Sequence, residues 1–209
     1  MTRRLDGTGP IEDVVGKTFH NQYLFQLRTD EVTRRDHQTN LQATARIAAI
    51  EHPAILPIYL TAPIADNFLF VTPKLATTLL AALSTHRLTA RGRVILLMQA
   101  ISGLARLHAE RILHRDITLR NILLDEDANH ALLFDFDLAV ALDDVGTTSY
   151  KAYYRGRIFG SPGYSVPPEI IDPGLAEAPI SVALDVFALG GALFALFTDQ
   201  TPYGVTEDM

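Results

Sequence analysis

One predicted hairpin constrains the fold of this chain more than any other part of its sequence. It joins the polar motif "HRDITLRN" (114–121) to a second polar motif, "FDFD" (134–137). The residues between the motifs form two short apolar runs around an Asp/Asn-rich turn, a pattern that predicts a β-hairpin. A hairpin of this length brings Asp135 back beside Asn121, so two oxygen-bearing side chains are expected to share one site.

The region that precedes the hairpin contains short strands and one helix. Apolar runs at 21–28, 54–60 and 67–72 predict strands. Residues 36–52 carry small and apolar side chains at helical spacing and predict a helix. This part of the chain is therefore expected to be rich in β-structure.

From about residue 76 the pattern changes to helices. Thr89 is a candidate N-cap for a long helix whose apolar side chains recur on one face. The most apolar stretch, 186–197, spans 12 residues and follows Asp185. It is too short to cross a bilayer and predicts a buried helix.

The composition excludes several classes of protein. The chain has 209 residues, 48% of them hydrophobic, which is enough for a sizeable core. Its net charge of −6 argues against a nucleic-acid partner, and the absence of cysteine excludes disulfides and thiolate zinc sites. The basic N-terminus lacks the apolar region of a signal peptide, so a cytoplasmic location without a membrane span is expected.

The order of the motifs resembles that of the protein kinase family. "HRDITLRN" is similar to its catalytic loop, "FDFD" to its metal motif DFG, "GSPGYSVPPE" (160–169) to the end of its activation segment, and "DVFALGG" (185–191) to the start of its buried helix. "HPAILPIYL" (52–60) adds an upstream match. The resemblance covers the whole chain and is weak before residue 40.

The resemblance implies an α+β, bilobal fold. Residues 1–75 would form a small β-rich N-lobe, and residues 76–209 a mainly helical C-lobe that lacks the last helices of the family. A partner protein or a further C-terminal segment is therefore expected to cover apolar surface of the helical lobe.

The resemblance also implies roles for the polar motifs. Asp116 would orient the acceptor hydroxyl and take its proton, while Asn121 and Asp135 would hold Mg²⁺ with the phosphates of ATP. Arg120 is a candidate for contact with the transferred phosphoryl group, and Arg115 for contact with a phosphate on the activation loop.

The same resemblance predicts a packing column between the lobes. Ile47, Ile58, His114 and Phe136 fall at its positions. Asp185 would anchor the column by binding the backbone of the catalytic loop, because a carboxylate in so apolar a helix must be hydrogen-bonded.

The nucleotide site departs from the family pattern at its lysine and glutamate. The strand expected to carry the lysine reads "YLFQLR" (23–28), which leaves Gln26 or Arg28 at that position. Lys17, expected on a preceding strand, is the candidate for a relocated lysine. The position of the helix glutamate is taken by Ala43, so the usual ion pair between lysine and glutamate cannot form.

Other candidate nucleotide contacts follow from the alignment. "GTGPIEDV" (7–14) matches the glycine-rich loop only in part, because Glu12 replaces its third glycine. The candidates in this loop and in the pocket beyond it are Gly7, Gly9, Val14, Lys74, Leu75 and Leu123, and Lys74 aligns with the segment that joins the lobes.

Two further departures concern the chemistry. "DFD" replaces DFG, and Thr118 replaces the catalytic-loop lysine, whereas Ser161 is similar to the threonine of Ser/Thr kinases. An atypical ATP-dependent kinase that phosphorylates protein Ser or Thr is therefore favoured. A pseudokinase that acts as a nucleotide-binding or scaffold module, and a small-molecule phosphotransferase of the same fold, are the alternatives.

Overall fold

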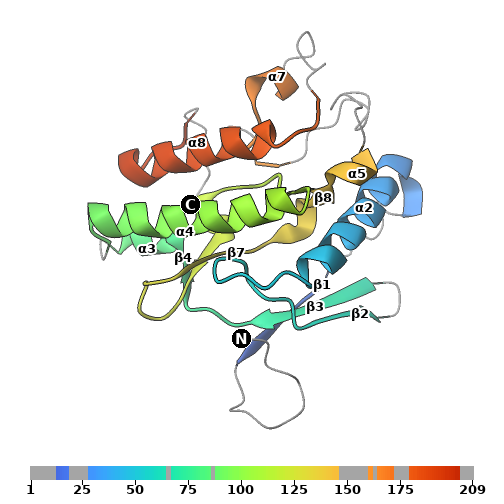
Figure 1. Ribbon diagram of the computed structural model, residues 1–209, viewed down its shortest axis with the longest axis horizontal. Coiled ribbons are helices and arrows are strands. Elements are labelled where there is room, and N and C mark those ends of the chain that lie inside the picture. Colours follow the sequence, from blue (N-terminus) through green and yellow to red (C-terminus); the bar gives the residue numbers. More distant parts are fainter. Residues whose placement is uncertain are drawn as a thin grey trace.

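The computed structural model describes residues 13–18, 28–64, 67–85, 88–145, 160–161, 164–171 and 179–202. Figure 1 shows a long central helix, α4 (Ala90–Ala109), with α8 (Ala183–Thr198) on one side and a small sheet on the other. The fold is α+β, as the sequence predicts, with a β-sheet N-terminal part and a helical remainder.

The sheet of the N-terminal part has three antiparallel strands in the order β1-β3-β2. They are β1 (Val14–Thr18), β2 (Leu60–Ile64) and β3 (Asn67–Pro73), and β3 lies in the middle. In the register of the sheet Lys17 faces Phe70 and Val15 faces Thr72. Because side chains alternate along a strand, Val15 and Lys17 lie on one face of β1 and Val14 on the other.

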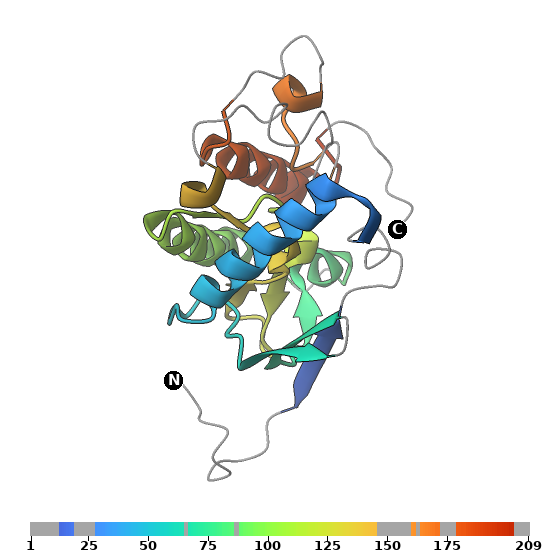
Figure 2. The ribbon, with the colours of Figure 1, turned by 90° about the vertical axis from the view of Figure 1, so that its right-hand side faces the viewer.

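Helix α2 (Glu31–Ile47) crosses between the sheet and the helical part (Figure 2). It begins five residues earlier than predicted, because Asp30 caps it by accepting a hydrogen bond from the Thr33 backbone N–H at 2.7 Å. It also ends five residues earlier, at Ile47. The predicted strand 21–28 lies outside the described residues except for Arg28, which is helical.

The helical part is organised around α4. Thr89 caps this helix as predicted, accepting from the Gly92 N–H at 3.1 Å. The Arg93 guanidinium donates to the Leu196 carbonyl at 2.7 Å and so ties α4 to α8. The shorter helices are α3 (Leu79–Ser84), α5 (Leu142–Val145) and α7 (Pro168–Ile171).

The predicted hairpin is present as β6 (Ile122–Leu124) and β7 (Ala131–Leu133), with β4 (Thr77–Thr78) beside β6. A second pair joins β5 (Ile112–Leu113) to β8 (Val140–Ala141). One 3-10 turn, η1 (Leu119–Asn121), precedes the hairpin, and another, η2 (Phe136–Leu138), follows it. Both polar motifs therefore leave the hairpin at the same end.

A continuous hydrophobic core joins the two parts. Ile47 of α2, Leu104 of α4, Phe136 and Leu196 belong to it, and Ile58 packs against it. The His114 and Phe136 rings meet edge to face, with their centroids 5.3 Å apart. These contacts agree with the predicted packing column.

Apolar side chains also remain exposed on α4 and α8, including Met98, Val186 and Phe197. The sequence predicts such a surface in the helical part. Among the helices that the structure describes, none has both the length and the apolar character needed to span a membrane.

Candidate active site

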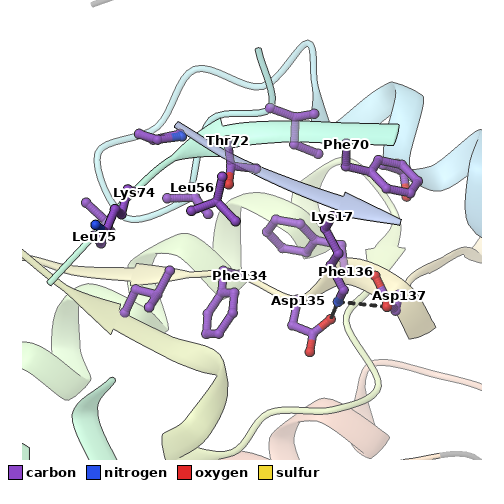
Figure 3. Close-up of a pocket in the computed structure, with 15 residues that line it drawn as sticks. Lys17, Leu56, Phe70, Thr72, Lys74, Leu75, Phe134, Asp135, Phe136 and Asp137 are labelled. Atoms are coloured by element: carbon purple, nitrogen blue, oxygen red, sulfur yellow. Dashed lines mark hydrogen bonds and ion pairs between the residues drawn. The ribbon is translucent and has the colours of Figure 1, made fainter. Parts of the chain in front are cut away.

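A cavity of about 240 Å³ lies between the sheet and the β6–β7 hairpin (Figure 3). Apolar side chains of both walls line most of it, among them Val15, Phe70 and Phe134. Of the residues predicted to contact a nucleotide, Lys17, Lys74, Leu75, Leu123 and Asp135 line this cavity. The cavity thus has mainly apolar walls, with Lys17, Asp135 and Asp137 at one end and Lys74 at the other (Figure 3).

Lys17 lies at the end of the cavity that also carries Asp135 and Asp137. Its Nζ donates to Asp135 Oδ1 at 2.6 Å and pairs with Asp137 Oδ2 at 2.8 Å (Figure 3). Burial, the largest single influence, lowers the pKa of Lys17, but the two carboxylates together outweigh it and raise that pKa above its ordinary value. The ammonium is therefore charged at neutral pH.

Asp137 occupies the position where the sequence pattern expects glycine. Burial and the nearby Asp135 carboxylate raise the pKa of Asp137, while the Lys17 ammonium opposes that rise. Two carboxylates thus crowd one cation, so this end of the cavity favours the arrival of further positive charge.

Of the candidates for the strand lysine, Lys17 is the one that lies on a strand among the described residues. Gln26 lies outside the described residues and Arg28 is helical, whereas Lys17 stands on β1, directly beside the central strand β3. Strand β1, which pairs with the central strand β3, therefore supplies Lys17 to the wall of the cavity. Sequence reasoning named Lys17 as the candidate on a strand that precedes residues 21–28, and β1 is such a strand.

Two other expectations for the N-terminal part have different outcomes. Val15 lines the cavity where Val14 was expected, because Val15 shares the face of Lys17. Gly7, Gly9 and Glu12 lie outside the described residues.

Asp116 lies at the centre of a hydrogen-bond network. Its Oδ1 accepts from the Ser161 hydroxyl at 2.9 Å and the Ser165 hydroxyl at 3.0 Å, and its Oδ2 accepts from Asn121 Nδ2 at 2.8 Å. Ser165 was missed by sequence reasoning, because only the fold brings residue 165 to the catalytic loop. Both carboxylate oxygens of Asp116 therefore accept hydrogen bonds from side chains of the chain itself.

Asn121 and Asp135 come together as the hairpin predicts. The Phe134 N–H donates to the Asn121 carbonyl at 3.2 Å, which places Asp135 next to the start of β6. Asn121 Nδ2 donates both to the Asp116 carbonyl and to its carboxylate, so the amide oxygen of Asn121 is left to accept or ligate. Carboxylate and amide oxygens are the ligands that Mg²⁺ prefers, and these two residues fit that ion.

The backbone of the catalytic loop is held by Asp185, as predicted. This fully buried carboxylate accepts from the His114 N–H at 2.9 Å and the Arg115 N–H at 2.7 Å, and His108 Nε2 lies 2.8 Å from it. Arg115 has a positive φ of 67°, a conformation that costs energy in a residue with a side chain. Two backbone bonds to Asp185 fix that conformation.

Arg115 differs from the expectation that it awaits a loop phosphate. Its guanidinium donates to Asp36 Oδ1 at 3.0 Å and also to the Leu138 carbonyl. The side chains of Arg115 and Asp36 are only 2% and 5% exposed. Asp36, another residue that sequence reasoning missed, therefore ties helix α2 to the catalytic loop by a buried ion pair.

Helix α2 also holds the metal motif. Asn40 Nδ2 donates to the Phe136 carbonyl at 2.6 Å and to the Ala139 carbonyl at 3.0 Å. The amide of Asn40 thus satisfies two carbonyls of the turn that contains Asp137, so this turn is anchored to the helix.

Two positions of the catalytic loop complete the site. Arg120 is exposed in the turn η1. Thr118 is 5% exposed and places no charge near the cavity. The positive charge that the structure does place in the cavity wall comes from Lys17 and Lys74.

Comparison with known proteins agrees with this geometry. The sequence matches the protein kinase domain over residues 19–209. The chain belongs to the protein kinase family. The match includes the catalytic loop, the metal motif and α8, and it begins just after Lys17.

Curated relatives are serine/threonine kinases at low identity. Serine/threonine-protein kinase PkaB of Streptomyces coelicolor is 33% identical over 126 residues, which make up 57% of this chain and 28% of that protein. Serine/threonine-protein kinase PLK4 of Drosophila willistoni is 27% identical over 180 residues, 80% of this chain and 21% of the relative. A probable serine/threonine-protein kinase, PBL4 of Arabidopsis thaliana, is 32% identical over 124 residues, 57% of this chain and 28% of the relative. The chain thus spans less than a third of the length of these relatives.

Proposed function

We propose that this chain is a magnesium-dependent protein kinase that transfers the γ-phosphoryl group of ATP to a serine or threonine hydroxyl. The observation that carries the proposal is the position of Lys17, whose ammonium lies in the cavity 2.6 Å from Asp135. A phosphate site without a cation would favour a binding protein over an enzyme, because phosphoryl transfer depends on charge neutralisation and alignment. A lysine at this place supports the enzyme.

The catalytic residues divide the work between the acceptor and the phosphates. Asp116 orients the acceptor hydroxyl and takes its proton as the new oxygen–phosphorus bond forms and the bond to ADP breaks. Lys17 neutralises phosphate oxygens, and Arg120 is the candidate for contact with the phosphoryl group as it moves. The mainly apolar walls of the cavity take the adenine ring.

Asn121 and Asp135 are the residues that would hold Mg²⁺. When bound, the ion neutralises charge on the phosphates and helps to align them. Asn121 has its amide nitrogen engaged by Asp116 and so presents oxygen to the ion. Asp135 contributes a carboxylate, and the remaining ligands would be phosphate oxygens and water.

The preference for serine or threonine rests on Ser161. Its hydroxyl donates to Asp116 at 2.9 Å, so the residue similar to the threonine of Ser/Thr kinases lies against the catalytic carboxylate. Such a contact narrows the space around Asp116 and favours a short aliphatic alcohol over a tyrosine ring.

The test is phosphate transfer from labelled ATP and Mg²⁺ to a mixture of protein substrates. Asp116→Asn should lower turnover by about 10²–10⁴-fold, because it removes the base. Lys17→Met should lower it by about 10²–10³-fold through loss of phosphate stabilisation. Equal signal from the wild type and Asp116→Asn, or none from either, would overturn the enzyme proposal.

A pseudokinase is the second candidate, and the lost charges favour it. By the sequence resemblance, Ala43 takes the place of the family's glutamate, and Thr118 takes the place of a cation of the catalytic loop. If wild-type protein binds ATP without turnover, and Lys17→Met abolishes that binding, the chain is a nucleotide-binding module. Phosphorylation of aminoglycosides or choline without any transfer to protein would instead identify a small-molecule phosphotransferase.

A further inference from the structure

The ion pairs of Lys17 raise a problem once a metal is bound. Asp135 and Asp137 both contact its ammonium, at 2.6 and 2.8 Å. If Asp135 binds Mg²⁺, as proposed above, its negative charge is shared with a divalent cation and its attraction for Lys17 falls. Lys17 then requires another carboxylate to keep its long, flexible side chain aimed at the phosphates.

Helix α2 does not provide that carboxylate. Residues 37–50 contain no acidic side chain, and Ala43, which the sequence resemblance aligns with the family's glutamate, is fully buried. The nearest acidic residue on the helix, Asp36, is in its buried pair with Arg115. Among the residues that the structure describes, Asp137 is the carboxylate that remains in contact with Lys17.

Asp137 is held firmly enough to serve as an anchor. It lies in the turn η2, one residue after Phe136, whose ring packs on His114 and whose carbonyl accepts from Asn40 at 2.6 Å. Two residues later, the Ala139 carbonyl accepts from the same amide at 3.0 Å. The backbone on both sides of Asp137 is thus fixed to helix α2, and the position of its carboxylate follows from that.

We propose that Asp137 is the positioning residue for Lys17, and that its carboxylate replaces the missing helix glutamate while Asp135 binds the metal. The aspartate in place of the glycine of the metal motif and the alanine in place of the helix glutamate are then one compensated change. Both changes affect the partner of the Lys17 ammonium. Ala43 removes a carboxylate from helix α2, and Asp137 supplies one from the turn η2. This inference rests on the proposed kinase function.

The test is a double-mutant cycle on residues 17 and 137 with MgATP, in which affinity is measured by calorimetry and turnover by phosphate transfer. Asp137→Asn should lower affinity or kcat/KM by about 10–100-fold, the usual effect of removing a group that orients a ligand-binding side chain. Asp137→Glu should restore most of the loss. In a Lys17→Met background Asp137→Asn should have no further effect, because the group that it positions is gone.

Asp143→Asn is the matched control. It removes the same charge from an exposed aspartate whose partners are Arg46 and Arg111, outside the cavity, and it should leave affinity and turnover unchanged. Repeating the titration with EDTA separates positioning from general damage. Without metal, Asp135 can hold Lys17, so the effect of Asp137→Asn should shrink, whereas a merely structural role would persist.

Each other outcome has a definite reading. If Asp137→Asn binds MgATP as well as or better than the wild type, the inference is overturned. If the losses of affinity caused by Asp137→Asn and Lys17→Met add in the double variant, Asp137 affects metal binding or folding independently of Lys17. The inference is then also overturned. If wild-type protein binds MgATP without turnover, the enzyme proposal fails while the affinity cycle still decides the role of Asp137; with no binding at all, both fail.

Discussion

Two groups of ion pairs connect distant parts of this chain, and they differ in their exposure to solvent: Lys17 with Asp135 and Asp137 (the open pair), and Arg115 with Asp36 (the closed pair). The side chains of Lys17, Asp135 and Asp137 are 46%, 32% and 38% exposed at the mouth of the cavity. Those of Arg115 and Asp36, which do not line the cavity, are 2% and 5% exposed. Lys17 in the open pair can leave its carboxylates and contact a ligand instead. Breaking the closed pair between Arg115 and Asp36 would cost much more free energy.

The physical reason is desolvation. A buried charge that loses its partner remains in a medium of low polarity, and this costs about 3–5 kcal/mol. Water screens an exposed charge, and such pairs contribute about 0–1 kcal/mol. We therefore assign the closed pair to the architecture of the catalytic loop and the open pair to ligand binding.

The closed pair also changes how helix α2 is coupled to the site. In the family pattern the strand lysine contacts this helix through a glutamate. Here the helix is tied to the catalytic loop through Asp36 and to the metal motif through Asn40. Lys17 can therefore change partners without releasing the helix.

The largest expected effect concerns the closed pair. Asp36→Ala should lower the free energy of unfolding by about 3–5 kcal/mol, because it leaves the Arg115 guanidinium buried without its carboxylate. Urea denaturation measures the change. Asp143→Ala, which removes an exposed aspartate of another ion pair, should produce little change. If Asp36→Ala changes the free energy of unfolding as little as Asp143→Ala does, the closed pair does not stabilise the fold and the comparison is wrong.

Asn40→Ala should have the next largest effect. It leaves the carbonyls of Phe136 and Ala139 without their donor and should lower the free energy of unfolding by about 2 kcal/mol. Gln38→Ala, on the exposed side of the same helix, is the control. If both substitutions are equally mild, the metal motif is not anchored by α2.

Lys17→Met should change stability much less. Because the side chain is 46% exposed, the free energy of unfolding without nucleotide should shift by less than about 1 kcal/mol. The same protein should lose most of its affinity for MgATP in calorimetry. A large loss of stability would show that Lys17 is structural, contrary to the comparison.

Salt should produce the smallest effect. Between about 0.05 and 0.5 M NaCl the screening length falls several-fold, so the stability difference between wild type and Lys17→Met should approach zero. The difference between wild type and Asp36→Ala should hardly change, since salt does not enter the buried site. Equal salt dependence in parallel urea titrations would contradict the assignment.

Much of the catalytic part could be predicted because its signals are local. The hairpin that joins Asn121 to Asp135 follows from two apolar runs and a turn within 16 residues. The role of Asp185 follows from the cost of a carboxylate in an apolar helix, and its bonds to the loop backbone confirm it. Such inferences need only short-range periodicity and the rule that buried polar groups are paired.

The N-terminal part was predicted less well because its geometry depends on neighbours in space. The sequence identified Lys17 as a candidate but not its strand neighbour, and the alternation of side chains places Val15 rather than Val14 in the cavity. Helix α2 begins earlier than predicted, since Asp30 was not recognised as its cap. Periodicity marks the body of an element better than its ends.

The sequence by itself determined the family, the catalytic loop and the order of the motifs, because these are written in adjacent residues. Only the tertiary structure decided which charges meet. Lys17 and Asp135 are 118 positions apart, and Arg115 and Asp36 are 79 apart. No local pattern specifies such contacts, because they result from the packing of α2 and the sheet against the hairpin. That packing sets one pair open to the cavity and buries the other.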